Sequence, residues 1–123
     1  MMACSGLALE RDPLPDPEAW LGTPSGAERL EQGLGEIYAW FARNEAMSAC
    51  VLRDAEHHQP TREAVELRMA PVFARAAEAL GEGLNAKARA LLAVAMDFAC
   101  WRTLASIEER PARLMAKAIA MLN

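Results

Sequence analysis

The chain has 123 residues and a net charge of −4, and 53% of its residues are hydrophobic. At this length we expect one domain, large enough to bury roughly two-thirds of the surface that the unfolded chain exposes. The negative charge and the lack of a Lys/Arg run argue against a nucleic-acid-binding surface, and no uncharged apolar stretch reaches the ~18 residues of a membrane helix.

The first 24 residues differ from the rest in their proline content. Residues 12–24, DPLPDPEAWLGTP, hold four of the seven prolines and predict a connector with little regular structure. Residues 3–11 before it predict a short helical fragment. We therefore divide the chain into residues 1–24, a helical remnant with a proline-rich connector, and residues 25–123, a helical domain.

Ala, Leu, Met and Glu are abundant in the chain and β-branched residues are scarce, so we expect an all-α bundle without a sheet. Apolar periodicity predicts about five helices, at about 25–43, 45–57, 61–81, 86–105 and 106–123. Ser25 with Glu28, and Ser106 with Glu109, have the spacing of capping boxes. Pro71 predicts a kink or two helices within the third.

Three further residues mark the ends of helices. Asn44 predicts a break and a new cap between the first two helices. Gly81 or Gly83 suits a left-handed C-cap after the third, and Asn85 can cap the fourth. Pro111 is tolerated in the first turn of the last helix.

The last two helices carry more apolar surface than a monomer of this size can cover. The stretch ALLAVAMDFACW at 90–101 is apolar nearly all round, and the chain ends on a broad apolar face. Exposed patches of this kind usually mark an interface, so we expect a symmetric homodimer through residues 86–122. The residues assigned to this interface are Leu91, Phe98, Leu114, Ala118, Ile119 and Leu122.

The stretch YAWF at 38–41 gives the first helix an unusually wide apolar arc, with Trp40 on the far shoulder of the main stripe. Such a helix packs on two sides, or packs on one side and faces a cavity. The second possibility predicts an apolar pocket for a small, largely hydrophobic molecule, and the other interpretation is ordinary core. The residues assigned to the pocket are Trp40, Phe41, Met47, Cys50, Val51, Phe73, Met96, Asp97 and Trp101.

Asp97 is the single charge in the stretch at 90–101. It could anchor a cationic effector, but we favour a carboxylate that is already paired or that faces solvent. His57 and His58 are neighbours on a helix and do not face one another, and no ligand stands at a metal-site spacing from them. We therefore predict no metal site.

Cys4, Cys50 and Cys100 stand far apart and cannot all pair, and no basic stretch followed by an apolar one marks a signal peptide. A reducing cytoplasm is the predicted location. Cys50 and Cys100 are expected to be buried, inert thiols.

Three segments carry a resemblance to a known family: DPEAW at 16–20, RLEQGLGEIYAWFARNEAMSACVLRDAE at 29–56 and VAMDFACWRTLA at 94–105. They resemble the C-terminal domain of tetracycline-repressor-type (TetR/AcrR) transcriptional regulators. The resemblance implies an all-helical domain that binds a small effector and dimerises through its last two long helices as a four-helix bundle. Members of that family begin with a helix-turn-helix DNA-binding domain, which this sequence lacks.

The resemblance predicts the effector-binding and dimerisation domain of a TetR-type regulator, a repressor that reaches DNA only through an absent helix-turn-helix domain. The alternative is a stand-alone helical dimer that sequesters a small ligand or a protein partner without binding DNA. An enzyme is the third reading, but no nucleophile–base pair or metal set can be assembled from these residues. We therefore predict no catalytic residue and no cofactor.

Overall fold

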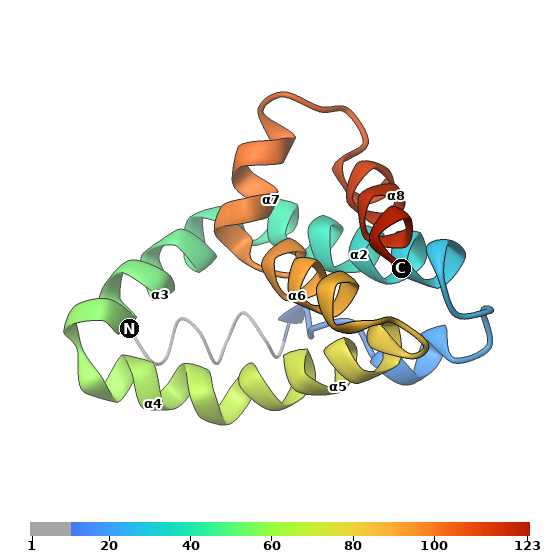
Figure 1. The fold of residues 1–123 in the computed structure, drawn as a ribbon. Coiled ribbons are helices and arrows are strands. Elements are labelled where there is room, and N and C mark those ends of the chain that lie inside the picture. Colours follow the sequence, from blue (N-terminus) through green and yellow to red (C-terminus); the bar gives the residue numbers. More distant parts are fainter. Residues whose placement is uncertain (1–10) are drawn as a thin grey trace.

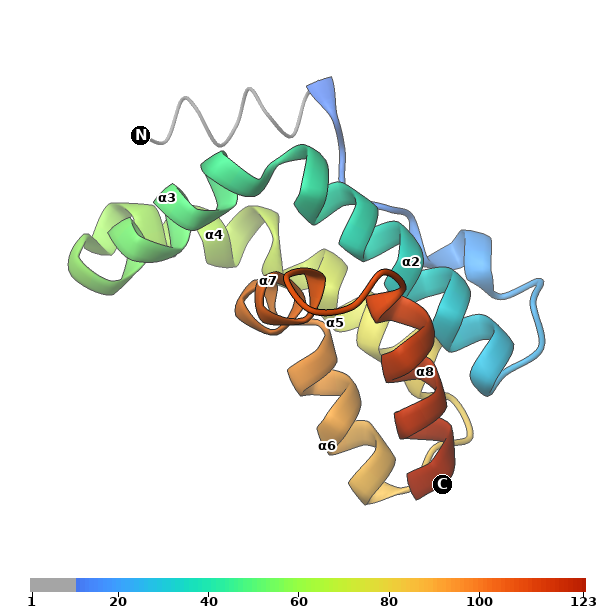
Figure 2. The ribbon, with the colours of Figure 1, turned by 90° about the horizontal axis from the view of Figure 1, so that it is seen from above.

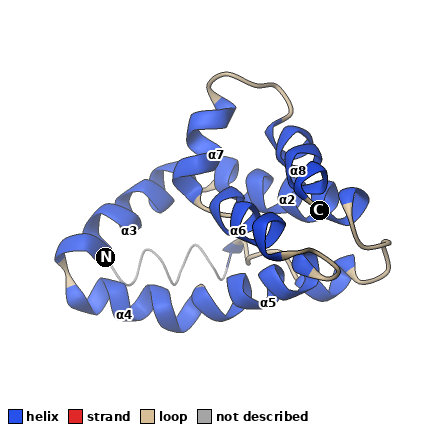
Figure 3. Cartoon of the chain, viewed as in Figure 1, coloured by secondary structure: helices blue, strands red, loops and turns tan. Residues whose placement is uncertain are grey.

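The computed structural model describes residues 11–123, so the fragment expected at 3–11 lies outside the described residues except for Arg11. Within the described range the chain is helical and has no strand (Figure 3), which confirms the all-α prediction. A short 3₁₀ helix, η1 (Pro17–Trp20), precedes seven α-helices, and none of the described helices has the length and apolarity needed to cross a membrane. The α-helices are α2 (Ala27–Arg43), α3 (Glu45–His57), α4 (Gln59–Arg68), α5 (Ala70–Gly81), α6 (Ala86–Ala95), α7 (Phe98–Ala105) and α8 (Pro111–Leu122).

The start of α2 differs from the prediction. Its N-cap is Gly26, which has a φ of 104° and no side chain to cap with, so the capping box of Ser25 and Glu28 does not form. The predicted boundary at Asn44 is confirmed, because α2 ends before it and α3 begins after it. The Asn44 side chain does not cap α3, however. Its amide donates to the carboxylate of Asp12 and to the carbonyl of Trp40.

Two of the five predicted helices are each divided into two shorter helices in the structure. Pro71 lies in the first turn of α5, so the expected break there is confirmed. The helix expected at 86–105 is also interrupted, at Asp97, whose extended backbone and side chain cap α7 by accepting a hydrogen bond from the Ala99 amide. The capping box expected at Ser106 and Glu109 is absent, because Ser106 ends α7 and donates to the Thr103 carbonyl instead.

The turn between α5 and α6 forms as expected. Gly83 adopts a φ of 80°, the left-handed region that glycine occupies without strain, and the Asn85 side chain caps α6 by accepting from the Ala88 amide. Asn85 also joins the end of the chain to this turn. Its side-chain amide donates to the Leu122 carbonyl, and its backbone amide donates to the side chain of Asn123.

Helix α2 lies at the centre of the fold and packs against α8 on one side and against α5 and η1 on another (Figure 1). Helix α6 lies beside both α5 and α8, and α3 and α4 form a hairpin that extends away from this body (Figures 1 and 2). The wide apolar arc of α2 is therefore explained by packing on more than one side. The largest fully buried side chains are Trp20, Trp40, Leu30, Leu34, Leu80, Leu92 and Ile119.

Two buried polar groups connect α2 to other parts of the fold. The Arg29 guanidinium donates to the carbonyl of Ala79 and forms an ion pair with Glu82 at 2.7 Å. The Tyr38 hydroxyl donates to the carbonyl of Ala95 at 2.6 Å, and burial raises the pKa of this phenol well above its usual range. Both groups are hydrogen-bonded, as buried polar groups must be to avoid a desolvation penalty.

Candidate functional site

A cavity of about 210 Å³ lies between α3, the junction of α4 with α5, and the junction of α6 with α7, with the end of α2 behind it. Six of the nine residues predicted for the pocket line it. They are Phe41, Met47, Val51, Phe73, Met96 and Asp97. The cavity is partly open to solvent, and nearly all of its lining is apolar.

The other three predicted residues do not line this cavity. Trp40 is completely buried, and its indole N–H donates to the Asp12 carbonyl at 2.7 Å. Trp101 is buried behind the cavity wall, where its ring lies 6.0 Å from that of Phe41. Cys50 is half-buried, and its thiol donates to the Asp54 carboxylate. Trp40 and Trp101 belong to the hydrophobic core, whereas Cys50 does not.

The sequence interpretation missed five lining residues: Ser48, Leu52, Met69, Ala70 and Phe98. Helical spacing could have found most of them. Ser48 lies three residues before the predicted Val51 and four before Leu52 on α3, and Met69 stands one turn before Phe73. Phe98 had been assigned to the dimer interface, and the break at Asp97 turns it into the interior instead.

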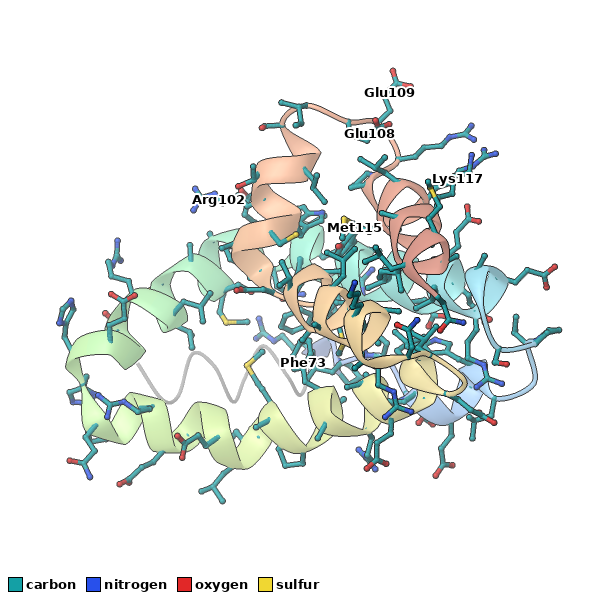
Figure 4. The ribbon with its side chains drawn as sticks, viewed as in Figure 1. Phe73, Arg102, Glu108, Glu109, Met115 and Lys117 are labelled. Carbon is teal, nitrogen blue, oxygen red and sulfur yellow. The ribbon has the colours of Figure 1, made fainter. Side chains whose placement is uncertain are left out.

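Aromatic rings form one wall of the cavity. The rings of Phe41 and Phe98 meet edge to face at 83°, with centroids 5.4 Å apart, and Phe41 also contacts Phe73. Figure 4 shows Phe73 pointing from α5 into the interior of the fold. Three methionines, Met47, Met69 and Met96, complete much of the lining. Their flexible thioether side chains can adapt to ligands of differing shape.

The Ser48 hydroxyl is the exceptional polar group of the site. The side chain is only 6% exposed, and its oxygen has no hydrogen-bond partner, alone among the buried side-chain N and O atoms of the described residues. Serine in a helix often donates back to the carbonyl one turn earlier, but here the backbone amide of Ser48, not the hydroxyl, bonds the Asn44 carbonyl. A buried hydroxyl without a partner costs about 1–3 kcal/mol, so its persistence suggests a role.

Asp97 contributes the one carboxylate of the lining. The residue is exposed, so the structure places it in solvent, where it caps α7. It also affects its neighbour one turn along, because burial and the Asp97 charge together raise the pKa of the Cys100 thiol. No Lys, Arg or His side chain is among the described residues that line the cavity.

The residues assigned to a dimer interface fall into three groups. Phe98 and Ile119 are buried within the core of the chain, and Leu91 and Ala118 are half-buried. Leu114 and Leu122 are exposed on α8, and so is Met121, which lies within the predicted interface range 86–122. Figure 4 shows the division on α8, where Met115 points inward and Lys117 points away from the body.

The described residues include no group of three or more His, Cys, Asp or Glu side chains that could hold a metal ion. A scan against protein-family models, a search of curated proteins and a search of solved structures each find no match to this chain. The case for a function therefore comes from the cavity and from the resemblance of the sequence segments.

Proposed function

We propose that this protein is a helical domain that binds a small, largely hydrophobic molecule in the cavity between α3, α5 and α7. The observation that carries the proposal is an apolar cavity of about 210 Å³ whose lining residues include Ser48, a serine with a buried, unpartnered hydroxyl. Apolar pockets with a few placed polar groups are typical of small-molecule sites. Ordinary core packing would fill such a space, and it would leave no hydroxyl unpaired.

The size of the cavity limits the size of the ligand. A dry engineered cavity of about 150 Å³ accepts benzene, while drug-sized ligands occupy roughly 300–1,000 Å³. A cavity of about 210 Å³ therefore suits a molecule of one or two rings, or a short branched hydrocarbon of similar volume.

We further propose that the domain acts as the effector-binding and dimerisation part of a TetR-type transcriptional regulator. The resemblance supports this, because the segments at 29–56 and 94–105 that carry it supply α2, α3 and α7, which contribute walls of the cavity. Ligand binding would then shift the population between two dimer arrangements, and a helix-turn-helix domain elsewhere in the intact regulator would report that shift on DNA.

Ligand binding is tested by titrating the protein with a panel of one- and two-ring apolar compounds. Trp101 packs against Phe41 and Phe98 of the cavity wall, so a bound ring should quench or shift its fluorescence saturably. Ligand at 100 times its Kd should stabilise the fold by about 2.7 kcal/mol and raise the melting temperature accordingly.

A matched pair of variants shows whether binding occurs in this cavity. Ala70 and Ala77 are both exposed on α5, but only Ala70 lines the cavity, so Ala70→Phe should place a ring at the cavity's edge and Ala77→Phe should add the same ring away from it. Binding should be lost in Ala70→Phe and retained in Ala77→Phe. Equal binding by the two variants, or no response of the wild-type protein to any compound, would refute the proposal.

The regulatory part of the proposal has a separate test. The DNA immediately upstream of the first codon should encode an in-frame helix-turn-helix domain. A stop codon directly upstream would favour the alternative, a stand-alone helical dimer that sequesters its ligand without binding DNA. This outcome leaves the ligand-binding proposal intact.

A further inference from the structure

We infer that the ligand is a neutral compound of one or two rings with a single hydrogen-bonding group, which pairs with the hydroxyl of Ser48. This inference rests on the proposed function and names the class of molecule that the cavity selects. Ser48 is 94% buried and lines the cavity, and its hydroxyl has no hydrogen-bond partner.

A partner for this hydroxyl is absent from the neighbouring described residues. The hydroxyl does not donate to the Asn44 carbonyl one turn earlier, which accepts the Ser48 backbone amide at 2.8 Å and could accept a second hydrogen bond. Every other lining side chain except Asp97 is hydrocarbon or thioether. A buried water needs about two to four polar partners, which this lining does not supply readily. The hydroxyl oxygen is closed to solvent, so a ligand would reach it when the Ser48 side chain turns toward the cavity, where a hydrogen-bonding group on the ligand would satisfy it.

The charges around the cavity indicate that the ligand is neutral. No cationic side chain among the described lining residues could pair with a ligand anion, and the Asp97 carboxylate at the rim would repel one. Asp97 is exposed and already caps α7, so a cation attracted to it would be held at the rim in solvent and not beside Ser48. A charge inside the cavity would lack the partner that a buried charge requires.

The shape of the wall indicates a flat ligand. Phe41, Phe73 and Phe98 line the cavity and pack on one another in stacked and edge-to-face pairs, the arrangements that aromatic rings prefer. A planar ring can add to this cluster in either arrangement. Because the volume is about 210 Å³, a bicyclic compound approaches the upper limit.

The experiment uses pairs of compounds that match in shape and differ in one polar group. Indole and its hydrocarbon counterpart indene differ by an N–H donor, and quinoline and naphthalene differ by a nitrogen acceptor. The affinity of each is measured by calorimetry for the wild-type protein and for Ser48→Ala. The ratio of affinities within each pair removes the hydrophobic contribution that the two compounds share.

A net hydrogen bond corresponds to roughly a three- to tenfold difference in affinity. We expect the ratio for at least one pair to fall by that factor in Ser48→Ala, while the hydrocarbon of the pair binds as before. Ser48→Thr, which retains a hydroxyl, should keep the preference, and Ser106→Ala at an exposed site should not change it.

The unliganded protein provides a second readout. Because Ser48→Ala removes an unsatisfied hydroxyl, the variant should be as stable as the wild type or more stable. A clear loss of stability would show that the hydroxyl has a partner within the protein, and would overturn the inference. Unchanged ratios in both pairs would also overturn it while leaving the proposed function standing. Failure of all four compounds to bind the wild type would count against both.

Discussion

The rings of Phe41 and Phe73 lie nearly parallel, 15° apart, with their centroids separated by 6.2 Å. Phe41 belongs to the central helix α2 and Phe73 to α5, and both line the cavity. This contact joins the core of the fold to the candidate site. A change to either ring should therefore alter both stability and the size of the cavity.

Truncating Phe73 should test this double role. Phe73→Ala removes a ring that is partly buried, so we expect a loss of about 2–3 kcal/mol, below the 3–5 kcal/mol of a fully buried phenylalanine. The enlarged cavity should favour larger ligands. Urea denaturation measures the first effect and calorimetry with two- and three-ring compounds the second. An unchanged size preference in a folded Phe73→Ala variant would show that this ring does not bound the site.

Two glycines on α2 should respond in opposite directions to the same substitution. A Cβ added at Gly33 would clash with the side chain of Leu80, a core residue that is only 1% exposed. Gly33→Ala should cost about 1–3 kcal/mol through overpacking. At Gly35 the nearest atom is 4.0 Å away, so Gly35→Ala should add about 0.5–1 kcal/mol from helix propensity.

Urea denaturation of the two glycine variants provides the measurement. The midpoint should fall for Gly33→Ala and rise for Gly35→Ala, with an unchanged dependence of free energy on urea. If both variants gained stability, α2 and α5 would have to be farther apart than the structure shows.

Much of the helical order was predictable from the sequence, because it depends on local chemistry. Pro71 lacks an amide hydrogen and so marks a helix start, and Asn85 and Gly83 have the side chain and the backbone freedom that their positions require. The break at Asp97 was missed. A continuous apolar pattern over 90–101 favoured one helix, whereas the aspartate could cap a second one.

The site was predictable only in part, for a different reason. Periodicity assigns a residue to a helix face but does not say which partner covers that face. Trp40 was assigned to the cavity for its place on the wheel, yet the connector covers it through the Asp12 carbonyl. The lack of a partner for the Ser48 hydroxyl could not be recognised from the sequence, since it is a property of the surroundings in three dimensions.

Asp12 should make stability depend on pH in the acid range. Its carboxylate accepts hydrogen bonds from Arg43 at 2.7 and 3.1 Å and from Asn44, and these bonds, chiefly those from Arg43, hold its pKa below the ordinary value of 3.8. A lowered folded-state pKa gives a contribution that is present above the unfolded-state value and lost as pH falls through the folded-state value. The stability advantage of wild type over Asp12→Asn should therefore shrink below about pH 4.

Chemical denaturation across a pH series measures this advantage. Arg43→Gln supplies the matched control, because it removes the guanidinium that chiefly lowers the pKa of Asp12. In the Arg43→Gln background, the change in the free energy of unfolding caused by Asp12→Asn should depend less on pH. If the stability advantage of wild type over Asp12→Asn grew as pH fell, the Asp12 carboxylate would not be held by these donors.

The exposed apolar side chains of α8 should mediate self-association. Leu114, Met121 and Leu122 are exposed there, and exposed groups of this kind are typical of an interface. Light scattering at micromolar concentration should report twice the mass of the chain. The double variant Leu114→Glu, Leu122→Glu should report a monomer, because burying two unpaired carboxylates in the interface is costly.

The choice of variants separates association from folding. Ile119 was assigned to the same interface, but it is 0% exposed, so a charge there would unfold the chain and reveal nothing about a dimer. Leu67 is the better control, since it is 78% exposed on α4, away from α8 (Figure 1). Leu67→Glu should leave the mass unchanged. If the α8 variant remained dimeric, or if the wild type were monomeric at these concentrations, α8 would not be the interface that the apolar face predicts.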